Sequence, residues 1–235
     1  MAAINAIALS IQLLLATQSR TDVQPIKDEL AKISIDSLSI ELNDDDVIKT
    51  FWINCYNYYV RILIRENSPD LYTQSARTAF FSNKLIVIAG QQLSLNDIEH
   101  GMLRHSKIWW SLGYLNKFSG SKFEKQFRVP LDYRIHFALN CGASSCPPVR
   151  FYEPDKINDQ LDIAMRSFLS AEVKFNQETN TATISQILGW YKGDFGGKNG
   201  IKNLLRDEKL IPKTKRVKIA YSTYDWSIPI KEIIL

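Results

Sequence analysis

The 235-residue sequence predicts an α+β fold, in which several helices pack around a small, mainly antiparallel sheet in a single domain. Helical patterns with clear start signals recur along the chain, whereas the β-rich segments are short and are bounded by turn residues. Hydrophobic residues make up 45% of the chain, which is ample for a core at this length. Because no Pro/Ser-rich linker interrupts the sequence, we expect one domain made of an N-terminal helical segment (1–46), a core (47–170) and a C-terminal extension packed on the same domain (171–235).

The N-terminal segment predicts two helices. Apolar residues recur at helical spacing in the first (Ile4, Ile7, Ile11 and Leu14), and residues 21–31 predict the second. The first apolar stretch has about the length of a signal-peptide core, but no Lys or Arg precedes Arg20 and no clean cleavage site follows. We therefore interpret it as a packed helix and expect a cytoplasmic protein, with an exported form as the alternative.

The clearest helix start is the NDDD sequence at 43–46, because acidic side chains cap free amides and suit the positive end of the helix dipole. The helix is expected to stop before Pro69. A polar stripe that contains Asn54, Asn57 and Arg61 runs along it. An apolar stripe lies beside the polar one (Phe51, Cys55, Tyr58 and Ile62). The asparagines either form a half-exposed face or reach into a pocket, where buried amides would need partners.

Two hairpins and a last strand supply the predicted sheet. β-rich runs flank turn residues in segments 84–95 and 173–188, and residues 216–228 predict the final strand. Further helices are expected in the second half of the chain, over 153–170, 185–191 and 201–208.

A helix after the first hairpin carries candidate functional groups. Ser94 and Asp97 stand in the positions of a capping box, which predicts a helix start. Glu99 and His100 follow near the middle of this helix. Arg104 lies four residues after His100, so the two side chains share one face.

The segment RIHFALNCGASSCPP at 134–148 holds one of the three histidines and two of the three cysteines. Residues 132–141 predict a strand, which a Gly/Ser/Pro loop follows. A thiol needs a base or a positive neighbour to become a nucleophile, and His136 is the histidine nearest to these cysteines in the sequence. The pattern suggests a thiol-dependent hydrolase or acyl-transfer enzyme, with Cys141 or Cys146 as nucleophile and His136 as base.

The other groups of this candidate site come from separate elements. Glu99, or one of the asparagines of the long helix, is expected to orient His136, and the amides of GASS at 142–145 could form an oxyanion hole. Asp194 is interpreted either as a structural turn residue or as a loop carboxylate near a pocket. Substrate contacts are assigned to five polar side chains: Asn54, Asn57, His100, Arg104 and Asn140.

Three other interpretations stay open. In the first, the chain is a non-catalytic binding or protein-interaction domain with structural cysteines and a structural His136, since buried cysteines are more common in such roles. In the second, His136, Cys141, Cys146 and His100 bind zinc, although the usual zinc knuckle has two residues between its cysteines. In the third, Cys141 and Cys146 form a disulfide.

Composition narrows the partners. The net charge is +4 without a dense basic block or a nucleic-acid motif, so we expect no nucleic-acid partner. No hydrophobic run approaches the ~20 residues of a membrane span. We expect no cofactor and no metal ion, and either a small-molecule or peptide substrate or a protein partner.

Three sequence blocks resemble the widespread family known as domain of unknown function 547. They are FWINCYN (51–57), LSLNDIEHGMLR (93–104) and RIHFALNCGASSCPPVRFY (134–152). The resemblance is best over about 47–170, and WYKGDFG (190–196) and YDWSIP (224–229) extend it. The family has no settled activity, so the resemblance implies no particular reaction. Its members usually carry an aliphatic residue where this chain has Cys55, which argues against Cys55 as a shared catalytic residue.

Overall fold

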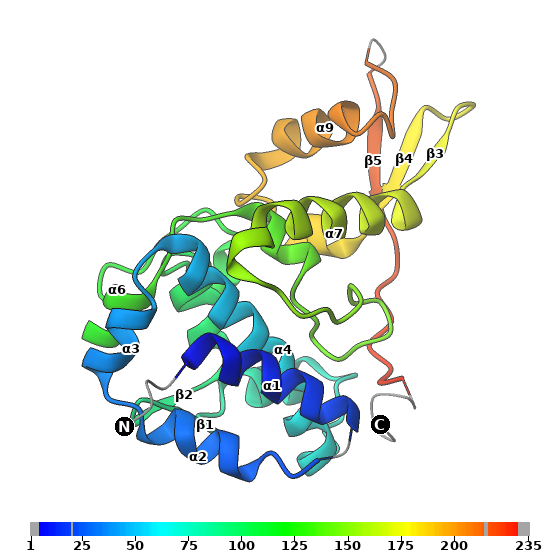
Figure 1. The fold of residues 1–235 in the computed structure, drawn as a ribbon. Coiled ribbons are helices and arrows are strands. Elements are labelled where there is room, and N and C mark those ends of the chain that lie inside the picture. The colour runs from blue at the N-terminus through cyan, green and yellow to red at the C-terminus, as the bar shows by residue number, and fades with distance from the viewer. Residues whose placement is uncertain (1–4, 20, 214–215, 230–235) are drawn as a thin grey trace.

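The computed structural model describes residues 5–19, 21–213 and 216–229, and it confirms the α+β prediction. Helices form most of the molecule, together with a two-stranded hairpin and a separate three-stranded sheet (Figure 1). The hairpin and the first helices lie at one end, and the three-stranded sheet lies at the other (Figure 1). Buried side chains form one large core cluster around the long helix and a second cluster between the three-stranded sheet and the helices that pack near it.

The long helix α4 (Asp45–Asn67) lies at the centre of the larger core. Asp44 caps it by accepting hydrogen bonds from the amides of Asp46 and Val47, as the acidic start signal predicts. Ser68 adopts the left-handed conformation and ends the helix directly before Pro69. Almost every residue from Ile48 to Ile64 is buried, so both predicted stripes of this helix face protein.

Helix α1 (Ala6–Ser19) packs along α4 (Figure 1). Of the predicted apolar stripe, Leu14 is buried, whereas Ile7 and Ile11 are only partly covered; Leu9 and Leu13, outside that stripe, are buried as well. The reason is that apolar residues surround this helix almost completely, so their spacing does not define one side. Ile4 lies outside the described residues.

Short elements complete the first half of the chain. The backbone amides of Ala89 and Gly90, at the hairpin turn, donate to carbonyl oxygens at the end of the second helix and so attach the hairpin to it. The elements are α2 (Gln24–Lys32), α3 (Ile35–Glu41), α5 (Gln74–Ser82), the antiparallel strands β1 (Ile86–Ile88) and β2 (Gln91–Leu93), and α6 (Lys122–Phe127).

The second half of the chain contains the other sheet. Strand β4 pairs antiparallel with β3 and parallel with β5, and the chain after β5 runs back along the molecule (Figure 1). There the amide of Ser144 donates to the carbonyl of Ser227. The elements are α7 (Ile157–Glu172), β3 (Lys174–Asn176), β4 (Thr181–Ile184), α8 (Gln186–Trp190), α9 (Gly197–Asp207) and β5 (Lys218–Tyr221).

The predicted strand over 132–141 is wrong. Residues Tyr133–Phe137 form a 3₁₀ helix, η3, which Asp132 caps. The Asp132 carboxylate accepts hydrogen bonds from the backbone amide and the guanidinium of Arg134, and this local bonding replaces strand pairing. Ile135 to Leu139 are consecutively buried, so side chains do not alternate between two faces.

Three further short helices position loops. Residues Asp97–Leu103 form η1, which is π-helical where an α-helix was expected. Its capping box is present, because the amides of Ser94 and Asp97 bond to each other's side chains. The other two are the 3₁₀ helices η2 (Trp109–Ser111) and η4 (Pro154–Lys156).

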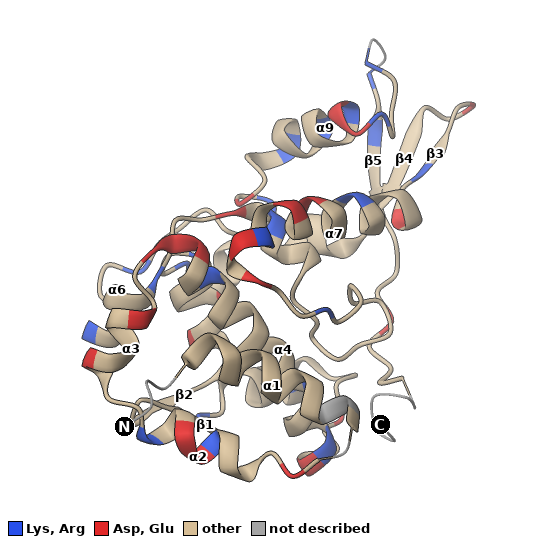
Figure 2. Ribbon diagram, viewed as in Figure 1, with Lys and Arg blue, Asp and Glu red and all other residues tan. Residues whose placement is uncertain are grey.

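Charged residues of both signs are interspersed over most elements in the view of Figure 2, whereas α1 carries none. Within the part of the chain that the structure describes, no helix is long and apolar enough to cross a membrane.

Candidate functional site

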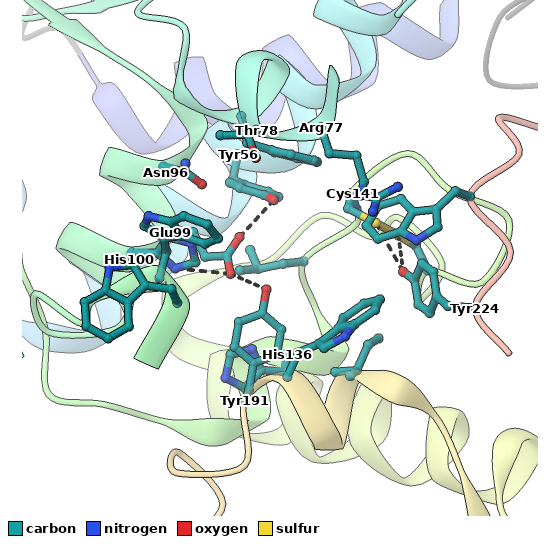
Figure 3. Close-up of a pocket in the computed structure, with 18 of the residues that line it drawn as sticks. Tyr56, Arg77, Thr78, Asn96, Glu99, His100, His136, Cys141, Tyr191 and Tyr224 are labelled. Carbon is teal, nitrogen blue, oxygen red and sulfur yellow. Dashed lines mark hydrogen bonds and ion pairs between the residues drawn. A yellow bond between two sulfur atoms is a disulfide. The ribbon is translucent and has the colours of Figure 1, made fainter. Parts of the chain in front are cut away.

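A cavity of about 570 Å³ lies between α4, α5, η1, α8 and the chain that follows β5 (Figure 3). Four of the five tryptophans of the sequence line it. Its polar wall includes Glu99, His100, His136 and the paired cysteines Cys141 and Cys146. Its aromatic wall consists of Tyr56, Phe81, Trp109, Trp110, Trp190, Tyr191, Tyr224 and Trp226. The cavity therefore joins residues of all three sequence blocks with residues from the C-terminal part of the chain.

Glu99 is held between two phenols (Figure 3). Its Oε2 accepts a hydrogen bond from Tyr56 at 3.0 Å, and its Oε1 accepts one from Tyr191 at 2.6 Å. Burial alone would raise the pKa of Glu99, but three effects outweigh it, so this pKa is lowered: the charge of His100 in the acidic range where that ring is protonated, the charge of Arg104, and the hydrogen bond from Tyr191. Burial and the Glu99 charge raise the pKa values of both phenols well above the usual value, so they remain donors. Glu99 is therefore a fixed carboxylate at neutral pH.

His100, the next residue, is a neutral neighbour of this carboxylate. Its Nδ1 lies 2.8 Å from Nη1 of Arg104, and because a guanidinium only donates, Nδ1 must accept. Burial and the charge of Arg104 lower the pKa of His100 to about 4. Nδ1 also lies 3.5 Å from Oε1 of Glu99, but because His100 is neutral this contact is not an ion pair at neutral pH.

The carboxylate that orients His136 is Asp194, not Glu99. Nε2 of His136 lies 2.8 Å from Oδ2 of Asp194, and Nε of Arg104 donates to the same oxygen at 2.6 Å. Burial lowers the pKa of His136 despite this carboxylate, whereas the bonds from His136 and Arg104 outweigh burial and lower the pKa of Asp194. The imidazole also stacks on Tyr191 with 3.9 Å between ring centroids. His136 is therefore a neutral, rigidly held ring in the cavity wall.

The two candidate nucleophiles are bonded to each other. Cys141 and Cys146 form a disulfide with Cα atoms 6.1 Å apart, and the hydroxyl of Tyr224 lies 3.2 and 3.1 Å from the two sulfurs (Figure 3). In this state neither sulfur is a thiolate or a metal ligand, so the zinc alternative does not fit and the disulfide alternative does. Among the described residues, no group of three His, Cys, Asp or Glu side chains is arranged to hold a metal ion. The remaining cysteine, Cys55, is a free thiol buried in α4.

Three asparagines assigned to substrate contacts bond to the backbone instead. Asn54 donates to the carbonyl of Tyr152 at 3.0 Å and accepts from its amide at 2.9 Å. Asn57 bonds in the same way to the carbonyl of Ala138 and the amide of Asn140, and the Asn140 side chain in turn holds the loop that ends at residue 147. None of these three amides lines the cavity, and neither does Arg104. Through these hydrogen bonds, the asparagines fix α4 to the segment 138–152, which carries the disulfide.

Several residues of the cavity wall were missed by the sequence analysis. Trp190 packs against Tyr224 and Trp226, with 4.7 and 5.6 Å between ring centroids. The guanidinium of Arg77 lies 4.3 Å from the centre of the Trp226 ring, and its Nη1 donates to two backbone carbonyls of the preceding loop. The only sequence signal was the aromatic density of 190–196 and 224–229, which does not reveal that these segments meet α5.

The comparisons with known proteins agree with the resemblance of the three blocks. The family model described as "Protein of unknown function, DUF547" matches residues 40–169, which is more than half of the 235-residue chain. No curated protein and no solved structure matches the chain. Tyr191 and the aromatic residues around Tyr224 lie outside the matched range although they line the cavity, and so does Asp194, which bonds to His136.

Proposed function

Since this chain belongs to the DUF547 family, whose function is unknown, we propose a function from its site: the chain is a ligand-binding domain that takes a small molecule, or one side chain of a larger partner, into the aromatic cavity. The observation that carries the proposal is the cavity itself. Its volume of about 570 Å³ lies within the range of ~300–1,000 Å³ that is usual for ligand sites. A mainly aromatic wall with a few fixed polar groups is the usual composition of such sites.

The arrangement of the polar groups supports binding over catalysis. The Glu99 carboxylate is held by two phenols and its pKa is lowered, so at neutral pH it has no proton to donate. Nε2 of His136 is bonded to Asp194, and the sulfurs are bonded to each other. These groups are rigid and paired, which suits recognition of a bound group with little reorganisation.

The entrance of the cavity also fits a binding role. Trp109 and Trp110, on η2, line the cavity and yet are 51% and 60% exposed. Large aromatic side chains that remain exposed beside a cavity are typical of binding surfaces.

A thiol-dependent hydrolase or acyl-transfer enzyme is the second candidate. One observation favours it: His136, Cys141 and Cys146 line the same cavity. It requires reduction of the disulfide, after which one thiol would have to transfer its proton to a base. The test is hydrolysis of activated esters and amides by the reduced protein. Turnover that is absent from the oxidised protein and abolished in Cys141→Ser or Cys146→Ser would establish this candidate over the binding domain.

The binding proposal is tested with the tryptophans of the cavity as the probe. We would record intrinsic fluorescence of the whole chain against a panel of small cations, anions, neutral sugars and apolar molecules. We expect a saturable change for at least one class, because four of the five tryptophans line the cavity.

Two matched variants of α5 locate the response. Thr78 lines the cavity and is exposed, so Thr78→Phe should narrow it and weaken binding. Ala79, the next residue, is also exposed and does not line the cavity, so Ala79→Phe should leave binding unchanged. The absence of any saturable response, or a response that Thr78→Phe does not alter, would overturn the proposal.

A further inference from the structure

We infer that the ligand of this cavity carries a compact organic cation, such as an alkylated ammonium group, which sits against Glu99 within the aromatic wall. This inference rests on the proposed binding function and names the chemical class of its ligand. Three features lead to it: the charge balance of the buried ionisable groups in and behind the cavity wall, the chemistry of the aromatic groups and the position of the only cavity-lining arginine among the described residues.

The buried ionisable groups in the cavity wall and directly behind it have one negative charge in excess; they are Glu99, His100, His136, Arg104 and Asp194. Glu99 and Asp194 are both ionised because their pKa values are lowered, and His100 and His136 are neutral because theirs are lowered as well. Arg104 is the one buried cation of this group, and its side chain is fully buried against Asp194. Two carboxylates and one guanidinium leave a net charge of −1.

The excess charge is on Glu99. Among the described residues, no Lys or Arg nitrogen lies within ion-pair distance of its carboxylate, which has only phenol donors and the neutral His100 beside it. Glu99 is 6% exposed and faces the cavity. Arg104 acts on Glu99 only from beyond ion-pair distance. A buried carboxylate without a direct ion pair is costly, and a bound cation would supply that ion pair.

The groups around this carboxylate suit a cation with an apolar surface. Faces of Trp, Tyr and Phe attract cations through their negative ring faces, and recognition of quaternary ammonium groups is the best-known use of this effect. Tyr56 from α4 and Tyr191 bond to the carboxylate itself, and Trp109 and Trp110 from η2 line the same cavity, so aromatic groups reach it from several directions. A strongly hydrated metal cation would gain little from such a wall.

Arg77 determines which end of the cavity receives the cation. It lies with Cys141 and Tyr224 on one side of the cavity, whereas Glu99 and His100 lie on the other (Figure 3). A positive ligand group is therefore repelled by the Arg77 side and attracted to the Glu99 side.

The experiment compares three probes of the same shape. Choline is the cation, 3,3-dimethylbutan-1-ol is its neutral isostere, and 3,3-dimethylbutanoate is an anion of similar size. We would measure their affinities for the full, oxidised chain by calorimetry and tryptophan fluorescence. We expect choline to bind at least about ten-fold more tightly than the neutral isostere, because the cation gains the attraction of the Glu99 carboxylate in addition to that of the aromatic faces. The comparison of the probes on the native chain needs no variant.

Two matched variants identify the counter-charge. Glu99→Gln removes the charge and keeps the shape, and we expect it to reduce the preference for choline to about three-fold or less. Glu124→Gln is the control, because Glu124 is also buried, at 7% exposure, but bonds to Ser106 and does not line the cavity. It should leave the preference unchanged.

The outcomes separate this inference from the proposed function. Equal affinity for choline and its neutral isostere, tighter binding of the anion or of a neutral sugar, or a preference for choline that Glu99→Gln leaves intact would each overturn the cation assignment. If a probe still binds in those cases and Thr78→Phe still weakens its binding, the proposed binding function stands and only the cation assignment fails. If no member of the wider panel binds, the proposed function fails and the cation assignment fails with it.

Discussion

Replacement of Asp194 by alanine should destabilise the protein far more than loss of a surface charge. The Asp194 and Arg104 side chains are both 0% exposed, and one carboxylate oxygen of Asp194 accepts hydrogen bonds from Arg104 and His136. Asp194→Ala leaves a buried guanidinium and a buried imidazole N–H without their acceptor. Loss of one partner from a buried ion pair costs about 3–5 kcal/mol, which is a large part of the stability of a typical domain.

Urea denaturation followed by circular dichroism measures this loss as a change in midpoint at constant slope. Arg166→Ala is the control, because the Arg166 side chain is 61% exposed and pairs with Glu208 at 3.5 Å, an interaction worth about 1 kcal/mol or less. The double variant Arg104→Met/Asp194→Leu removes both charges, and its loss of stability should be much smaller than the summed losses of the single variants Arg104→Met and Asp194→Leu. A loss below about 1 kcal/mol for Asp194→Ala, or additive losses in the double variant, would refute the reasoning.

Three further predictions concern other parts of the site. His100 is buried and its pKa is lowered from 6.5 to about 4, so the unfolded chain binds this proton first and the free energy of unfolding falls as the pH drops through this interval. In urea titrations at several pH values, His100→Gln should remove about 3 kcal/mol of that fall, and an unchanged pH profile would contradict the assignment. Asn57→Ala leaves two buried backbone groups unpaired and should cost about 2–4 kcal/mol in urea titrations, against about 1 kcal/mol or less for the exposed Asn67→Ala; equal losses would contradict the structural role of Asn57. The unfolded, unreduced chain should show one titratable thiol, that of Cys55, whereas three thiols would show that the disulfide is absent. Reduction of the disulfide should lower the free energy of unfolding by only about 2 kcal/mol, because the loop between Cys141 and Cys146 is short.

Local signals in the sequence predict the fold well where one segment decides its own structure. The Asp44 cap, the capping box of Ser94 and Asp97, and the two hairpins are present because their bonds join residues that are close in the sequence. The prediction failed at 132–141, where alternating residues suggested a strand. There the Asp132 carboxylate accepts hydrogen bonds from Arg134 within the same turn, and these bonds favour a 3₁₀ helix over a strand. The alternation of residue types does not show such local bonding.

The members of the site were easier to predict than their partners. Glu99, His100, His136 and the two cysteines line the cavity, as the polar content of the three blocks suggested. The partner of His136 was not predictable, because Asp194 is 58 residues away and no spacing rule connects the two. Asn54 and Asn57 were ambiguous for a different reason, since a buried amide can bond either to a ligand or to the backbone and the residue type is the same in both cases.

The cavity depends on a part of the chain that the family model does not cover. Residues 40–169 supply Glu99, His136 and the disulfide, but Tyr191, which holds Glu99, and Asp194, which holds His136, come later. The chain after β5 adds Tyr224 against the disulfide, and the backbone bond between Ser144 and Ser227 fixes it there. The region that carries the family resemblance therefore contains the polar groups of the site, whereas their orientation and much of the aromatic wall come from the C-terminal part. A binding function of this chain must accordingly be tested on the full sequence, because a fragment limited to the matched range would lack one of the two phenol donors to Glu99, the partner of His136 and one side of the cavity.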